Sequence, residues 1–75
     1  MSFSDPRIKE YMDDGGAKYN EELSQFLLGI AALSMHVNGT VDTSQSTMIY
    51  KMSQGMSIHE AAMQEYEYLR RRVMG

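Results

Sequence analysis

The chain has 75 residues, which leaves room for one small domain and excludes a separate catalytic module beside it. Hydrophobic residues make up 43% and charged residues 23%, values typical of a folded globular protein. The absence of cysteine excludes disulfides, thiolate zinc sites and a cysteine nucleophile. The formal charge of −3 has the wrong sign for a protein that mainly neutralises phosphates.

The first ten residues, MSFSDPRIKE, have no basic start followed by an apolar stretch, so we expect no secretory signal. The longest apolar run covers residues 26–33, whereas a helix needs about 20 apolar residues to span a bilayer. We therefore expect a cytoplasmic protein without a transmembrane segment and without a membrane partner.

A short first helix is expected to begin at Asp5-Pro6. Aspartate accepts hydrogen bonds from the free amides of a first turn, and proline is tolerated in that turn because its missing N–H has no partner there. Ile8, Tyr11 and Met12 then fall on one side of the helix. The acidic and glycine-rich residues 13–16 end it.

The strongest helical pattern extends over about residues 17–37. Asn20 can cap this helix, and Glu21 and Glu22 lie in its first turn, where the helix dipole favours negative charge. Between residues 26 and 37 only two side chains are polar, and a helix that is apolar nearly all round is covered by protein. We therefore expect it at the centre of the fold.

This central helix carries two apolar strips, one of which consists of Leu28, Ala31, Ala32 and Met35. Another copy of the chain can cover one of the two strips. We therefore predict a homodimer of helical bundles.

The third expected helix begins at Asp42 or Ser44 and ends at Gly55. Asp42 and Gln45 have the spacing of a capping box, in which two side chains satisfy each other's backbone N–H groups. The polar stretch before this helix is expected to be a loop.

The fourth expected helix begins after Ser57, which has Glu60 at the reciprocal capping-box position. With the third helix it forms a C-terminal helical hairpin over about residues 44–74. The whole chain, residues 1–75, is therefore predicted to be a single all-α domain, a small bundle of three to four short helices.

Methionine is unusually frequent, with eight residues in 75. Its flexible side chain fills core space or forms an adaptable docking surface, and both interpretations apply here. Thioether binding of Cu(I) is a third interpretation, opposed by Gly55, which takes Met56 out of line with Met48 and Met52.

The C-terminal part of the last helix contains the only basic run of the chain. Tyr66 and Tyr68 point in nearly opposite directions on a helix, so Tyr68 is exposed if Tyr66 faces the core. The candidate partner-binding residues are Met48, Met52, Met56, Tyr68, Arg70, Arg71 and Arg72.

An acidic surface is the alternative contact region. It comprises Asp13, Asp14, Glu21 and Glu22, and it can cover a basic groove of a target by charge mimicry.

Neither His36 nor His59 has a metal-ligand partner at a usual spacing, and no nucleophile with an orienting group can be identified. We expect no enzymatic activity, no cofactor and no metal ion.

Two classes of function fit these observations. The first is a non-enzymatic module that binds another protein or protein complex, such as the small inhibitors and adaptors that phages encode. The alternative is a small dimeric DNA-binding regulator of the helix-turn-helix kind, with the arginines on the phosphates. Glu60 and Glu65 in the first turns of its second helix oppose this alternative, because they repel a phosphate backbone.

Overall fold

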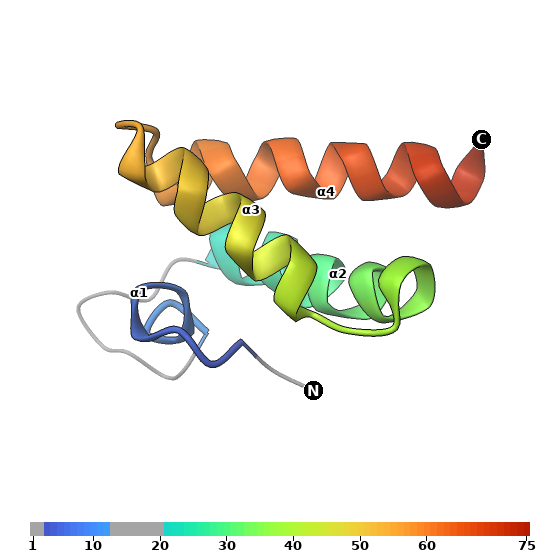
Figure 1. Cartoon of the computed structure of the whole chain (residues 1–75), viewed down its shortest axis with the longest axis horizontal. Helices are drawn as coiled ribbons and strands as arrows, with labels where there is room; N and C mark the ends of the chain where they lie inside the picture. The colour runs from blue at the N-terminus through green and yellow to red at the C-terminus, as the bar shows by residue number, and fades with distance from the viewer. Residues whose placement is uncertain (1–2, 13–20) are drawn as a thin grey trace.

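The molecule is built around two long helices, α2 and α4, that pack against each other, while α3 crosses them obliquely (Figure 1). The computed structural model describes residues 3–12 and 21–75. These residues form α1 (Pro6–Lys9), α2 (Glu21–Asn38), α3 (Asp42–Ser53) and α4 (Ile58–Met74), with no strand among them. The predicted all-α bundle with a C-terminal hairpin is confirmed.

The core lies between these helices and the segment that precedes α1. Leu27 and Ile30 of α2 are fully buried, as are Met48 of α3 and Leu69 of α4. The buried apolar side chains are Phe3, Ile8, Leu23, Leu27, Ile30, Ala31, Val41, Met48, Ala61, Ala62 and Leu69. Burial of apolar surface on this scale is the main favourable term in folding, at about 25 cal/mol per Å².

The central helix is covered on one side and open on the other. Its inward strip packs on α4 and α3. Of the second predicted strip, Ala31 is also buried, at 8% exposed, but Leu28 is 54% exposed and Met35 37% exposed, and Ala32 is exposed beside them. The expectation that protein surrounds this helix on every side is therefore wrong for a single chain. The predicted cap Asn20 and the expected first turns, residues 17–20, lie outside the described residues.

The end of α2 agrees with the sequence. Gly39 has a φ of +75°, a backbone conformation in which a side chain is strained, and its N–H donates to the Met35 carbonyl oxygen at 3.0 Å. The chain then turns through Thr40 and Val41 into α3.

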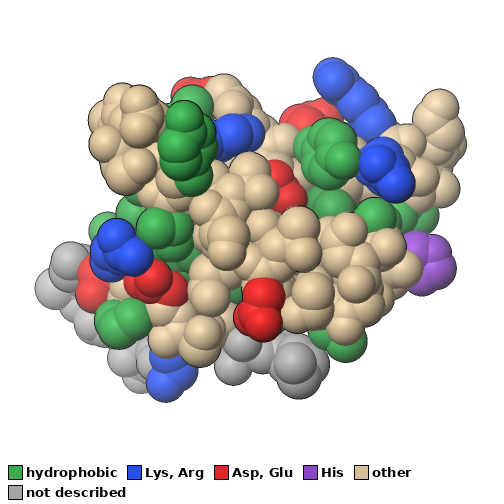
Figure 2. Space-filling view, viewed as in Figure 1, with side chains coloured by type: hydrophobic (Ala, Val, Ile, Leu, Met, Phe, Trp, Pro, Cys, Tyr) green, Lys and Arg blue, Asp and Glu red, His purple; other side chains and the backbone are tan. Residues whose placement is uncertain are grey.

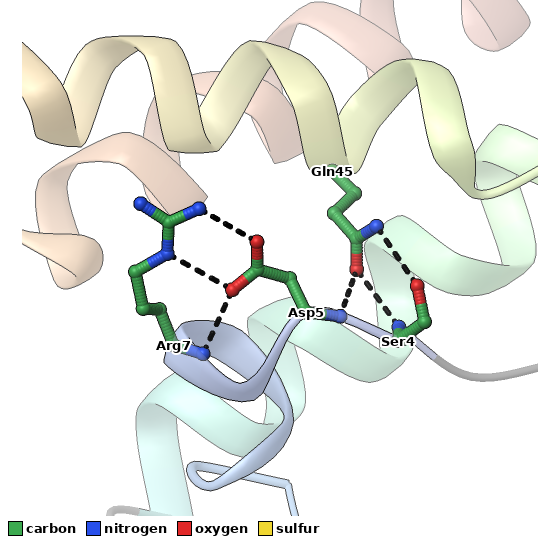
Figure 3. Close-up of polar contacts among 4 residues, drawn as sticks. All are labelled: Ser4, Asp5, Arg7 and Gln45. Carbon is green, nitrogen blue, oxygen red and sulfur yellow. Dashed lines mark hydrogen bonds and ion pairs between the residues drawn. The ribbon is translucent and has the colours of Figure 1, made fainter.

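The predicted capping box of α3 is wrong. Val41 occupies the N-cap position without a side-chain cap, and the Asp42 N–H donates to Thr40 Oγ1 at 3.1 Å. Gln45 instead holds the N-terminal segment, because its Oε1 accepts from the N–H groups of Ser4 (2.8 Å) and Asp5 (2.9 Å) (Figure 3). These amides precede α1 and have no helical partner of their own, so the long Gln45 side chain satisfies them.

Helix α1 begins at Pro6 as expected, but it ends at Lys9, before the predicted end at residues 13–16. The Asp5 carboxylate caps it by accepting from the Arg7 N–H at 2.9 Å, and the Arg7 side chain bonds the same carboxylate (Figure 3). After Lys9 the chain continues as a turn, and the Ser24 hydroxyl of α2 donates to the Tyr11 carbonyl oxygen at 3.1 Å. The acidic and glycine-rich residues 13–16 lie outside the described residues.

The turn between α3 and α4 follows the sequence closely. Gly55 has a φ of +100°, and the N–H groups of Gly55 and Met56 return to the carbonyl oxygens of Met52 (3.0 Å) and Lys51 (3.1 Å). Ser57 Oγ then accepts from the Glu60 N–H at 3.1 Å, which confirms the predicted cap of α4.

Candidate functional site

The three methionines predicted to bind a partner, Met48, Met52 and Met56, differ in how deeply they are buried. Met48 is fully buried in the core and cannot contact a partner, so its inclusion among the partner-binding residues is wrong. Met52 and Met56 are half-buried and pack against the core. These three methionines therefore serve packing, because their flexible side chains fill the space where α3 meets the rest of the bundle.

The other four predicted residues are all exposed, and we call Tyr68, Arg70, Arg71 and Arg72 the α4 terminal surface. Tyr68 is 51% exposed, whereas Tyr66 is half-buried against the core, as the opposite directions of the two side chains predict. Figure 2 shows basic and apolar side chains over the C-terminal half of α4, with acidic side chains beside them.

Two of the three arginines are held by tyrosines one helical turn earlier. Arg72 Nη1 donates to Tyr68 Oη at 3.1 Å, with its guanidinium 5.9 Å from the centre of the Tyr68 ring. The Arg70 guanidinium lies 5.6 Å from the centre of the Tyr66 ring. Such cation–π contacts restrict the arginine side chains before any partner arrives.

None of these arginines forms an ion pair with a carboxylate in the part of the chain that the structure describes. Glu67 and Arg71 have a spacing that allows one, but the structure does not form it. Within the described residues, these three guanidinium groups therefore have no carboxylate within 4.0 Å.

A groove of about 260 Å³ lies beside Tyr68, where α3 faces α4. We call it the Glu65 groove. It is lined by Asn38, Thr43, Thr47, Lys51, Glu65 and Tyr68. A second groove, of about 420 Å³, shares Lys51 and Tyr68 with the first, so Tyr68 forms a wall of both.

Glu65 is the unexpected residue of this site, because it is only 4% exposed. Ser44 Oγ donates to its Oε2 at 2.7 Å and lies 3.1 Å from Ser34 Oγ, which in turn donates to the Thr40 carbonyl oxygen at 2.6 Å. Both serines are fully buried. A polar chain thus links α4, α3 and the end of α2 through the core.

The Glu65 carboxyl has no cationic partner among the described residues. No lysine, arginine or histidine nitrogen there lies within 4.0 Å of it. Lys51 lines the same groove, but its Nζ donates to Gln64 Oε1 at 3.1 Å. A buried carboxylate without a counter-ion is costly, which marks this position as exceptional.

Sequence reasoning placed Glu65 with the acidic residues of α4 and missed its burial. One signal existed: Ser34 is one of two polar side chains in an otherwise apolar stretch of the central helix. A buried serine needs a hydrogen-bond partner, and Ser34 has one in the Thr40 carbonyl oxygen and a polar neighbour in Ser44.

Only part of the alternative acidic surface lies within the described residues. Asp13 and Asp14 lie outside the described residues, and Glu21 and Glu22 are exposed at the start of α2. Glu22 Oε1 lies 2.5 Å from His59 Nε2. The His59 and Phe26 rings pack edge to face, with their centres 5.7 Å apart. Glu22 therefore joins α2 to the first turn of α4.

Two further findings concern residues 3–12 and 21–75. No three histidine or carboxylate side chains in these ranges are placed to share a metal ion. None of the helices there is both long enough and apolar enough to cross a membrane.

The chain matches no protein-family model, no curated protein and no solved structure. Its function is therefore argued from the geometry of its own residues.

Proposed function

We propose that this protein is a small non-enzymatic module that binds another protein in the cytoplasm, as an inhibitor or adaptor of the kind that phages encode. The observation that carries the proposal is the α4 terminal surface. There, Tyr68 is half-exposed and bonded to Arg72, and none of the arginines is paired with a described carboxylate.

Tyrosine and arginine are the residue types that most often dominate the binding energy of an interface. Here Tyr68 and Arg72 are already bonded to each other, so less side-chain entropy is lost when a partner binds. The last turn of α4 is also open, with Val73 39% and Met74 74% exposed. Cations beside exposed apolar groups suit a partner surface that is acidic and partly apolar.

Affinity capture from the native host's lysate tests this proposal. Tagged wild-type protein is compared with Tyr68→Ala, with the triple variant Arg70→Ala/Arg71→Ala/Arg72→Ala, and with Tyr50→Ala as the matched control. Tyr50 is 66% exposed on α3 and lies outside the proposed surface. We expect the wild type and Tyr50→Ala to retain one protein that the triple variant loses and that Tyr68→Ala binds about tenfold more weakly. Equal capture by all four proteins would refute the proposal.

DNA binding is the second candidate, and the exposed arginines are the observation that favours it. The buried Glu65 cannot repel a phosphate backbone as strongly as the sequence suggests, but Glu60 is exposed and His59 is engaged with Glu22. A gel-shift assay with duplex DNA at low salt separates the candidates. Tight, salt-sensitive binding that the triple arginine variant loses would replace the first proposal with this one.

A further inference from the structure

We propose that the Glu65 groove receives a guanidinium group, the head of an arginine side chain on the partner protein. The inference rests on the proposed function, because it names the chemistry that the partner presents beside the α4 terminal surface. Tyr68 belongs to both regions, so one partner can contact them together.

The first argument is the charge of the groove wall. Glu65 is 4% exposed, and in the described part of the chain its carboxyl has one hydroxyl in bonding distance and no cationic nitrogen within 4.0 Å. A buried carboxylate in this state gains more from an incoming cation than an exposed one does, because water screens it less.

The second argument is access. Among the described residues, Ser44 is the one bonding partner of this carboxyl, and it bonds Oε2. Every fully buried side-chain oxygen or nitrogen in the described residues has a hydrogen-bond partner. Oε1 has none and is therefore not completely buried, and Glu65 is one of the residues that line the groove. A carboxylate has about four acceptor positions, which leaves room for a two-pronged donor beside Ser44.

The third argument concerns the shape of the donor. Tyr68 is one of the residues that line the groove, and planar guanidinium groups stack on aromatic rings while bonding a carboxylate through two N–H groups. An ammonium group is compact and more strongly hydrated, so it gains less from such a wall. Lys51 also lines this groove, but its ammonium group donates to Gln64 Oε1 and does not pair with the Glu65 carboxyl.

An NMR titration with methylguanidinium chloride tests the inference, with sodium chloride at equal ionic strength as the reference. Amide signals of the isotope-labelled wild type are followed as the probe is added. We expect saturable shifts at Thr43, Thr47, Glu65 and Tyr68. Glu65→Gln, which keeps the size and can still bond Ser44, should weaken binding by about tenfold or more.

Glu67→Gln is the matched control. It removes the same charge from the same helix, at an exposed residue that does not line the Glu65 groove. We expect its affinity for the probe to stay within about twofold of the wild type. Equal affinity in all three proteins, or wild-type shifts that do not saturate, would overturn the inference.

If Glu65→Gln does not fold, the wild type still decides. Nuclear Overhauser contacts between the methyl group of the probe and the Tyr68 ring are expected, and their absence would overturn the inference.

Failure of the proposed function can be distinguished from failure of this inference, because the proposed function is tested by capture from lysate. If methylguanidinium does not bind, this inference fails, but capture of the partner can still depend on Arg70, Arg71 and Arg72. Capture unaffected by the arginine and Tyr68 variants refutes the proposed function even where the probe binds.

Discussion

Gly29 of α2 lies directly beside the Tyr66 ring of α4. A Cβ atom at this position would lie 2.6 Å from Tyr66 Cε1 and 3.1 Å from Tyr66 Cδ1, distances shorter than ordinary van der Waals contact. The Tyr66 ring cannot easily move aside, because Phe26 packs on it with ring centres 5.5 Å apart and Arg70 lies over it. The missing side chain at Gly29 therefore leaves room for the Tyr66 ring against the backbone of α2.

Gly29→Ala is expected to destabilise the protein by about 1–2 kcal/mol. Overpacking costs about 1–3 kcal/mol, and the better helix propensity of alanine offsets up to about 1 kcal/mol of it. Chemical denaturation measures the free energy of unfolding. In a Tyr66→Ala background the clash is gone, so the same substitution should be neutral or stabilising there. Equal destabilisation in both backgrounds would contradict this account of Gly29.

The capping residue of α1 gives a pH-dependent prediction. Hydrogen bonds from the Arg7 side chain and then from the Arg7 N–H lower the pKa of the Asp5 carboxyl. A lowered pKa in the folded state stabilises the fold at pH values above the unfolded-state pKa, and this contribution is lost as the pH falls through the folded-state pKa.

We expect Arg7→Ala to raise the pKa of Asp5, while Arg71→Ala, a distant loss of the same charge, leaves it unchanged. A carboxyl NMR titration measures the pKa in each protein. An unchanged pKa in Arg7→Ala would show that this guanidinium has no influence on Asp5.

At the scale of elements, the start of α4 depends on one hydroxyl. Ser57 Oγ accepts from the Glu60 N–H, and no other side chain caps this end in the described residues. Ser57→Ala should lower the free energy of unfolding by about 1 kcal/mol. Ser46→Ala, at an exposed serine inside α3, should be neutral or slightly stabilising because alanine is the better helix former. Equal effects in thermal or chemical denaturation would refute the capping role.

The helices were predictable where local chemistry determines them. The Ser57 cap and the turns at Gly39 and Gly55 each involve groups within a few residues of one another, so the sequence alone indicates them. The apolar period of the central helix likewise predicts that Leu27 and Ile30 face the core.

The predictions that were wrong concern hydrogen bonds between residues far apart in the chain. Gln45 bonds Ser4 and Asp5 across some forty residues, and Glu65 bonds Ser44 across 21. Spacing rules describe neighbours on one helix, so they assigned Gln45 to a local cap and Glu65 to an exposed face. For the same reason the site was predicted in part: the exposed Tyr68 and arginines followed from helical geometry, whereas the buried Met48 and the groove depend on how the helices cross.

At the scale of the whole molecule, α2 carries one enclosed strip and one open strip. Leu27 is fully buried, and the next residue, Leu28, is 54% exposed. We propose that a second copy of the chain covers the open strip of Leu28, Ala32 and Met35, which makes the protein a homodimer.

Substituting these two leucines separates folding from assembly. Leu27→Asp buries an unpaired charge and should abolish folding, because a domain of this length is stable by only roughly 4–11 kcal/mol. Leu28→Asp should remain folded but sediment as a monomer, while the wild type sediments as a dimer at micromolar concentration. A monomeric wild type with a cooperative melt would refute the dimer. A folded Leu27→Asp variant, seen by circular dichroism, would show that the core lies elsewhere.

Amide hydrogen exchange along α2 tests the central structural claim most directly, since α3, α4 and the N-terminal segment all fold around this helix. We expect the N–H groups of Leu27, Ile30 and Ser34 to exchange among the slowest in the chain, at the rate of global unfolding. Exchange between residues 26 and 37 as fast as in a free peptide would contradict the account.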